Sequence, residues 1–138
     1  MKKYFLDTTI RTPYDNKNSG QRLEYLARLA IIGKACKADN LPASKGADIG
    51  TIQLKSNRAT VCNGSNLEKA MQADKATMYG YIAKNGTMYL LNPAEYRDLV
   101  LHFSRIEKAS ERSRQREPES IRLKYESRKM IAFLEGLN

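Results

Sequence analysis

Apolar residues recur along the chain with two spacings, one typical of helices and the other typical of strands. Stripes at intervals of three and four residues predict helices over 19–36, 67–75 and 93–106, and from 127 onward. Strict alternation predicts strands over 3–8, 51–56, 58–62, 78–84 and 87–91. This order predicts an α/β or α+β fold, with a small mixed central β-sheet flanked by helices.

Turn and cap signals separate these segments. The dipeptide Asn85-Gly86 lies between two alternating apolar runs and predicts a hairpin with a two-residue type I′ turn. Asn92 precedes a proline and stands three residues before Glu95, which predicts a capped helix start. The turn ending at Asn66 is placed to cap the helix that follows it.

The last third of the chain changes in composition. The chain is expected to divide into a core over residues 1–109, a charged link over 110–120 and an appended strand and helix over 121–138. Ile121, Leu123 and Tyr125 alternate as in a late edge strand, and Ser127 is placed to cap a final helix. A single amphipathic helix over this whole segment is the alternative.

Composition narrows the class of protein. A length of 138 residues suits one domain with a real core. No apolar run approaches the ~20 residues that span a bilayer, and the amino end meets an acid too early for a secretory signal, so we expect a cytoplasmic protein. Cys36 and Cys62 have no CxxC spacing and no histidine cluster beside them, which favours buried thiols over a zinc site or a disulfide.

The formal net charge is +9, which favours polyanions as partners. No segment combines a basic face with a strongly apolar one, so nucleic acid, DNA or else RNA, is a better expectation than a membrane. The alternative is a basic surface that meets an acidic protein partner.

One strand carries the candidate chemistry. In the segment 51–56, Ile52 and Leu54 occupy one face, while Gln53 and Lys55 occupy the other. Asp48 lies shortly before them. An amide oxygen and a carboxylate suit a hard divalent cation, and an ammonium group suits an attacking water or a phosphoryl charge.

Glu24 follows Gly20 in the first helix, and the chain then reads Gly46-Ala47-Asp48 and Gln53-Leu54-Lys55-Ser56. This arrangement resembles the PD-(D/E)xK nuclease superfamily, which has the restriction-endonuclease-like and Holliday-junction-resolvase-like fold. It is most similar to the branch in which glutamine replaces the second acid, as in Mrr-like nucleases.

The resemblance implies a role for each matching residue. Asp48, Gln53 and Glu24 would bind Mg²⁺ or Mn²⁺, and Lys55 would complete a catalytic set that hydrolyses DNA phosphodiesters with a metal-activated water. A homodimer would cut both strands of a duplex. Alanine replaces the proline of the motif, and only four residues separate Asp48 from Gln53, so Asp39 is the alternative acid at a longer spacing.

Several basic residues are candidates for nucleic-acid contacts: Arg11, Lys17, Lys45, Arg58, Arg112, Arg114 and Arg116. The last three belong to a run interleaved with acids, which is typical either of a solvated surface or of an arm that tracks phosphates. If catalysis is absent, the alternatives are a nucleic-acid-binding or inhibitory accessory protein of a mobile element, and a basic module in a protein complex.

Two further groups of side chains were weighed. Cys62 and His102 are conceivable as a thiol hydrolase pair, although no orienting third group is evident. Tyr79, Tyr81 and Tyr89 lie at strand spacing, where packing under a helix is the expectation and stacking on unpaired bases is the alternative.

Overall fold

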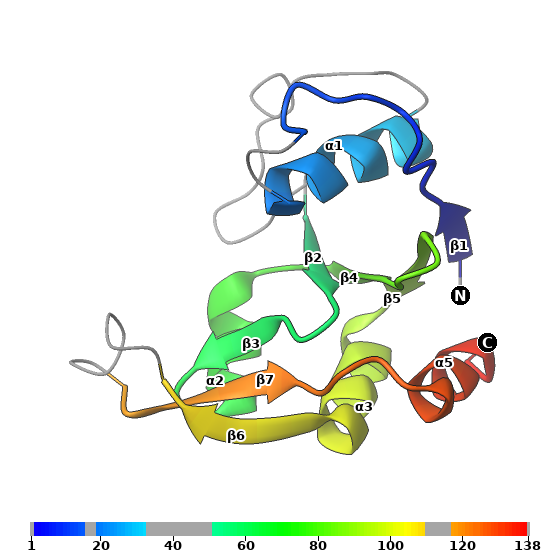
Figure 1. Ribbon diagram of the computed structural model, residues 1–138. Helices are drawn as coiled ribbons and strands as arrows, with labels where there is room; N and C mark the ends of the chain where they lie inside the picture. Colours follow the sequence, from blue (N-terminus) through cyan, green and yellow to red (C-terminus); the bar gives the residue numbers. More distant parts are fainter. Residues whose placement is uncertain (1, 16–18, 33–50, 110–116, 138) are drawn as a thin grey trace.

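Three layers of secondary structure stack in the computed structural model, which describes residues 2–15, 19–32, 51–109 and 117–137. Helix α1 forms the upper layer in Figure 1, a four-stranded sheet lies beneath it, and a three-stranded sheet forms the lower layer with the remaining described helices. The mixed α+β class predicted from the sequence is therefore confirmed, with the strands divided between two sheets.

The four-stranded sheet, called sheet A, has the strand order β1-β5-β4-β2. Its strands are β1 (Lys2–Phe5), β5 (Thr87–Leu91), β4 (Met78–Ile82) and β2 (Ile52–Ser56). β2 runs parallel to β4, whereas the other neighbours are antiparallel, so the sheet is mixed as expected. The register aligns Gln53 with Tyr79 and Lys55 with Tyr81.

The three-stranded sheet, called sheet B, has the order β3-β7-β6. Its strands are β3 (Thr60–Asn63), β7 (Glu119–Leu123) and β6 (Ser104–Lys108). β7 lies at its centre and begins within the range predicted as a link. The segment that follows the link thus belongs to the core, since Ile121, Leu123 and Met130 are at most 6% exposed.

Sheet B shows that the predicted end of one helix is wrong. The helical stripe predicted a helix through Ile106, but α3 (Pro93–Phe103) ends three residues earlier and Ser104 adopts an extended conformation. Ile106 pairs with Ile121 in β7 instead. The local spacing of apolar residues fits either a helix or a strand at Ile106. Pairing with β7, which lies later in the chain, selects the strand.

The helices begin where the sequence predicts. They are α1 (Ser19–Ile32), α2 (Leu67–Asp74), α3 and α5 (Arg128–Glu135). The Asn66 side chain accepts a hydrogen bond from the Lys69 backbone N–H, and Asn92 and Glu95 form a complete capping box. Ser127 caps α5 through the Met130 backbone N–H at 3.2 Å. The described part of the chain contains no helix long and apolar enough to cross a membrane.

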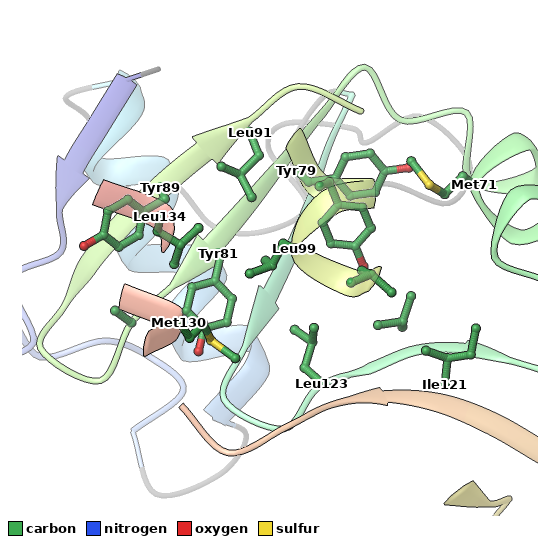
Figure 2. Close-up of a cluster of buried hydrophobic side chains, with 14 residues drawn as sticks. Met71, Tyr79, Tyr81, Tyr89, Leu91, Leu99, Ile121, Leu123, Met130 and Leu134 are labelled. Carbon is green, nitrogen blue, oxygen red and sulfur yellow. The ribbon is translucent and has the colours of Figure 1, made fainter. Parts of the chain in front are cut away.

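Two apolar clusters hold the layers together. Leu26 and Ala27 of α1 meet Ile82 and Met88 on the upper face of sheet A. The lower face supplies tyrosines to the larger cluster, which is shown in Figure 2. That cluster includes Tyr79, Tyr81, Tyr89, Leu99, Leu123, Met130 and Leu134.

The three strand tyrosines are packing residues. Tyr79, Tyr81 and Tyr89 are each 1% exposed, which confirms the predicted packing and removes the alternative of base stacking. The ring of Tyr79 lies parallel to that of Tyr96, with centroids 3.9 Å apart.

The β4–β5 hairpin exists, but its turn differs from the prediction. A type I′ turn would require positive φ at both Asn85 and Gly86. Gly86 has φ of +93°, but Asn85 is not among the residues with positive φ. The Ala83 N–H donates to the Thr87 carbonyl and the Gly86 N–H to the Ala83 carbonyl. This is a three-residue connection closed by a glycine in the left-handed region, and the Gly86 carbonyl in turn accepts from Leu6 at 2.8 Å.

Candidate functional site

Part of the predicted site falls outside the described residues. These positions are Asp39, Asp48, Lys17, Lys45, Arg112, Arg114, Arg116 and Cys36. Arg11 is described and lies exposed in the segment after β1. Glu24, Gln53, Lys55 and Arg58 are the predicted site residues that the structure places on defined elements.

Glu24 and Lys55 line one cleft of about 390 Å³. Its walls are the first turns of α1, the end of β2 and the start of β3. The Glu24 carboxylate accepts a hydrogen bond from Nη2 of Arg28 at 2.8 Å, and Arg28 is 1% exposed. Lys55 Nζ donates to the Thr60 carbonyl at 2.9 Å. The cleft therefore contains a carboxylate paired with a buried guanidinium and a lysine bonded to the backbone.

Gln53 lies on the other face of sheet A. Leu54 packs with Met88 in the apolar cluster that contains α1 residues, so its side chain faces α1. Successive side chains of a strand point to opposite faces, so Gln53 faces the tyrosine cluster. The Gln53 Oε1 atom is buried and has no hydrogen-bond partner among the described residues. Lys55 shares this face, but its position near the end of β2 places it on the cleft.

The described donors do not by themselves fit a divalent cation. No group of three or more His, Cys, Asp or Glu side chains occurs in the residues that the structure covers. Glu24 is the one carboxylate lining the cleft within those residues, and the Arg28 guanidinium already balances its charge. Mg²⁺ is usually held by one or two carboxylates with waters and phosphates, so the predicted metal set depends on Asp48.

A second surface lies beside this cleft, where the β2–β3 turn, the β4–β5 turn and the β7–α5 connection meet. We call it the basic rim, and its members are Arg58, Lys84, Lys124, Tyr125, Arg128 and Lys129. The Arg58 guanidinium lies 4.5 Å from the centroid of the Tyr125 ring, and its Nη1 donates to the Tyr125 hydroxyl at 3.0 Å. Lys84 Nζ lies 5.8 Å from the same centroid. The Tyr125 ring thus has two cations nearby while the residue remains 60% exposed.

Glu126 fixes the three parts of the rim to one another. Its carboxylate accepts from the Tyr81 hydroxyl at 2.9 Å and from the Lys84 backbone N–H at 3.0 Å. Its own backbone N–H donates to Asn57 Oδ1 in the β2–β3 turn at 2.7 Å. Burial, with the bond to Glu126, raises the pKa of Tyr81 well above its usual range, so this phenol is a permanent donor.

The cations of the rim are not neutralised by acids. Arg22, Arg97 and Arg105 each form an ion pair, but in the described part of the chain none of the rim cations does. Lys124, Arg128 and Lys129 are exposed. The Glu126 carboxylate lies within the rim, where it accepts hydrogen bonds from the Tyr81 hydroxyl and the Lys84 backbone N–H. Two of these cations, Arg58 and Lys84, lie over the Tyr125 ring, and the other three are close to it in the sequence.

The Arg58 backbone is strained. Its φ is +59°, in the left-handed region that residues with a Cβ avoid, at a cost of about 1–2 kcal/mol. The turn is closed by a hydrogen bond from the Ala59 N–H to the Ser56 carbonyl at 3.0 Å. This conformation sends β3 away from β2 into sheet B and places the Arg58 side chain over Tyr125.

The sequence identified Arg58 but missed the rest of the rim. Tyr125 was assigned to a strand by alternation, whereas β7 ends at Leu123. The available signal was local: residues 124–129 contain an aromatic residue among three cations. Such interleaving is typical of nucleic-acid contacts.

Cys62 and His102 are each engaged locally. The Cys62 thiol lies 3.7 Å from the Gly64 carbonyl, and burial raises its pKa, so it remains protonated. His102 Nδ1 lies 2.8 Å from the Asp98 carbonyl, and its ring packs 5.2 Å from that of Phe133. Nothing in these contacts supports a hydrolase pair.

No protein-family model, curated protein or solved structure matches this chain. Function is therefore inferred from the residues and their geometry.

Proposed function

We propose that the protein binds nucleic acid, DNA or RNA, through the basic rim. The observation that carries the proposal is the Arg58 guanidinium lying over the exposed Tyr125 ring, next to Lys84 and without an acidic partner in the described residues. A guanidinium fixed on an aromatic face keeps its planar set of donors ready for phosphate oxygens. Phosphate contacts of this kind release counterions and dominate nucleic-acid affinity.

The surroundings of the rim suit an extended polymer. A second cleft of about 290 Å³ lies between the start of α1 and the β4–β5 turn, and Asn57 and Lys84 are among its lining residues. Ser56 lines both this cleft and the one that contains Glu24 and Lys55. A chain bound along the rim would therefore pass beside both clefts.

Fluorescence anisotropy with labelled oligonucleotides at several salt concentrations tests the proposal. We expect the logarithm of the binding constant to fall linearly with the logarithm of salt concentration. Arg58→Gln and Lys84→Gln should each weaken binding and reduce the steepness of this fall by about one unit. Lys69→Gln is the matched control, because Lys69 lies exposed on α2, which contributes no residue to the rim, and its replacement removes the same charge.

The proposal fails if binding ignores salt concentration, or if the Lys69 variant loses as much affinity as the two rim variants. Capture of an acidic protein without any affinity for oligonucleotides would point to the protein-interaction module instead.

A second candidate, a phosphodiester-cleaving nuclease, is favoured by one observation: Glu24 and Lys55 line the same cleft beside the rim. Purified protein supplied with Mg²⁺ or Mn²⁺ should then cut plasmid or branched DNA, and a chelator should stop it. Asp48→Ala and Lys55→Ala should each abolish cleavage but preserve salt-sensitive binding. Binding without cleavage under any of these conditions would leave the binding function alone.

A further inference from the structure

Two large aromatic side chains lie exposed beside the β4–β5 turn. Phe5 is 71% exposed and Tyr125 is 60% exposed. A methyl group at Gly86 would lie 3.5 Å from Cε2 of Phe5, so the Phe5 ring borders one side of the turn. Lys84 reaches the Tyr125 ring from the same turn. Lys84 and Gly86 are two residues apart, a span of at most about 7 Å of chain, so both rings border one short segment.

Exposed aromatic rings are common one at a time, but Tyr125 has two cations over its ring and Phe5 borders the turn that carries one of them, Lys84. Arg58 and Lys84 lie beside Tyr125, and β1, which carries Phe5, pairs with β5 directly after the turn. Figure 1 shows β1 next to the β4–β5 hairpin. Rings that alternate with cations match a strand of nucleotides, in which flat bases alternate with phosphates.

We infer that the rim, together with Phe5 beside the β4–β5 turn, takes single-stranded nucleic acid, with bases stacking on Phe5 and Tyr125 while Arg58 and Lys84 hold the phosphates. The inference rests on the proposed binding function and names its ligand. In a duplex, each base is stacked within the helix and offers no face to a side chain, so the two rings would contribute nothing there. In a single strand, a base can leave its neighbours and stack on an aromatic ring.

Three probes of equal length, about 16 nucleotides, separate the contributions of base and phosphate. They are a single-stranded oligothymidine, a mixed-sequence duplex and a single-stranded abasic oligomer with the same number of phosphates. At one salt concentration the oligothymidine should bind most tightly, and the abasic oligomer at least about fivefold more weakly.

The variants Phe5→Ala and Tyr125→Ala should each weaken binding of oligothymidine by about fivefold or more, and Phe5→Ala should leave binding of the abasic oligomer almost unchanged. Tyr125→Phe should retain most of the affinity, because the ring remains. Leu101→Ala is the matched control: Leu101 is 68% exposed on α3, outside the rim, and its removal should change nothing. All three side chains are exposed, and thermal melting verifies that each of the four variants is folded.

The inference is overturned if the duplex binds as tightly as the single strand, if the abasic oligomer binds as well as oligothymidine, or if the aromatic variants bind normally. Those outcomes leave the proposed function intact as long as Arg58→Gln weakens salt-sensitive binding. If none of the three probes binds, the proposed function itself fails.

Discussion

Two tyrosine hydroxyls in the same core should respond in opposite ways to the same substitution. Tyr81 and Tyr96 are 1% and 2% exposed, respectively. The Tyr81 hydroxyl donates to the Glu126 carboxylate at 2.9 Å, whereas the Tyr96 hydroxyl is buried without a hydrogen-bond partner among the described residues. Replacement by phenylalanine removes one oxygen from each site and preserves the ring.

The expected magnitudes follow from what each oxygen does. Tyr81→Phe deletes a hydrogen bond to a charged group, worth about 1.5–3 kcal/mol of unfolding free energy. Tyr96→Phe removes a desolvated polar group and retains the parallel stack on Tyr79, so it should be neutral or should stabilise the protein by about 1 kcal/mol. The two variants should therefore differ by roughly 2–4 kcal/mol.

Urea denaturation followed by circular dichroism measures this difference. With a slope of about 2 kcal/mol per molar urea, the two midpoints should lie about 1–2 M apart, with Tyr81→Phe the lower. The slopes themselves should not change, because the same surface is exposed on unfolding. Equal destabilisation by both variants would refute the reasoning, since it would mean that the Tyr96 hydroxyl is hydrogen-bonded in the folded protein.

Two other predictions test the turn and the pH range of stability. Gly86→Ala should destabilise the protein by more than about 1 kcal/mol, because φ is +93° and the new Cβ would lie 2.9 Å from the Leu6 carbonyl oxygen. The destabilisation is measured as a lower urea midpoint. A midpoint equal to that of the parent chain would contradict the assigned turn. Burial and the bond to Glu135 raise the pKa of Tyr89 to about 12. Because the unfolded tyrosine has a pKa of about 10, the folded state favours the neutral phenol, and the stability from this residue should be complete below about pH 10 and be lost as the pH rises toward 12. A urea midpoint that stays level through this range, in a parent chain whose tyrosinate absorbance shows every tyrosine half ionised near pH 10, would contradict the burial of Tyr89.

The sequence predicted the features that depend only on neighbouring residues, namely the helix caps and the buried face of α3. The caps at Asn66, Asn92 and Ser127 each use a side chain that bonds a backbone N–H three residues later, and this geometry is written in the sequence. Helical stripes likewise predicted which face of α3 is buried, since Tyr96 and Leu99 are at most 2% exposed.

What the sequence did not predict depends on distant partners. Ile106 fits a helical stripe and a strand equally well, and its partner Ile121 is fifteen residues away. At the site, alternation separated Gln53 from Leu54 correctly, but it contains no information about which face α1 covers. As a result, Glu24 and Lys55 meet at a cleft while Gln53 points to the tyrosine cluster. The exposure of Tyr125 similarly follows from where β7 ends.

The hydrogen bonds of Glu126 determine when the parts of the basic rim can be joined during synthesis. Glu126 joins Asn57 and Tyr81, which precede it by 69 and 45 residues. On the ribosome, both earlier segments emerge before residue 126, so the basic rim stays incomplete until residues 124–129 have been synthesised. Closing loops of this length costs entropy before any contact compensates, which makes this step slow. The three parts of the basic rim should therefore come together only after residue 126 has been synthesised.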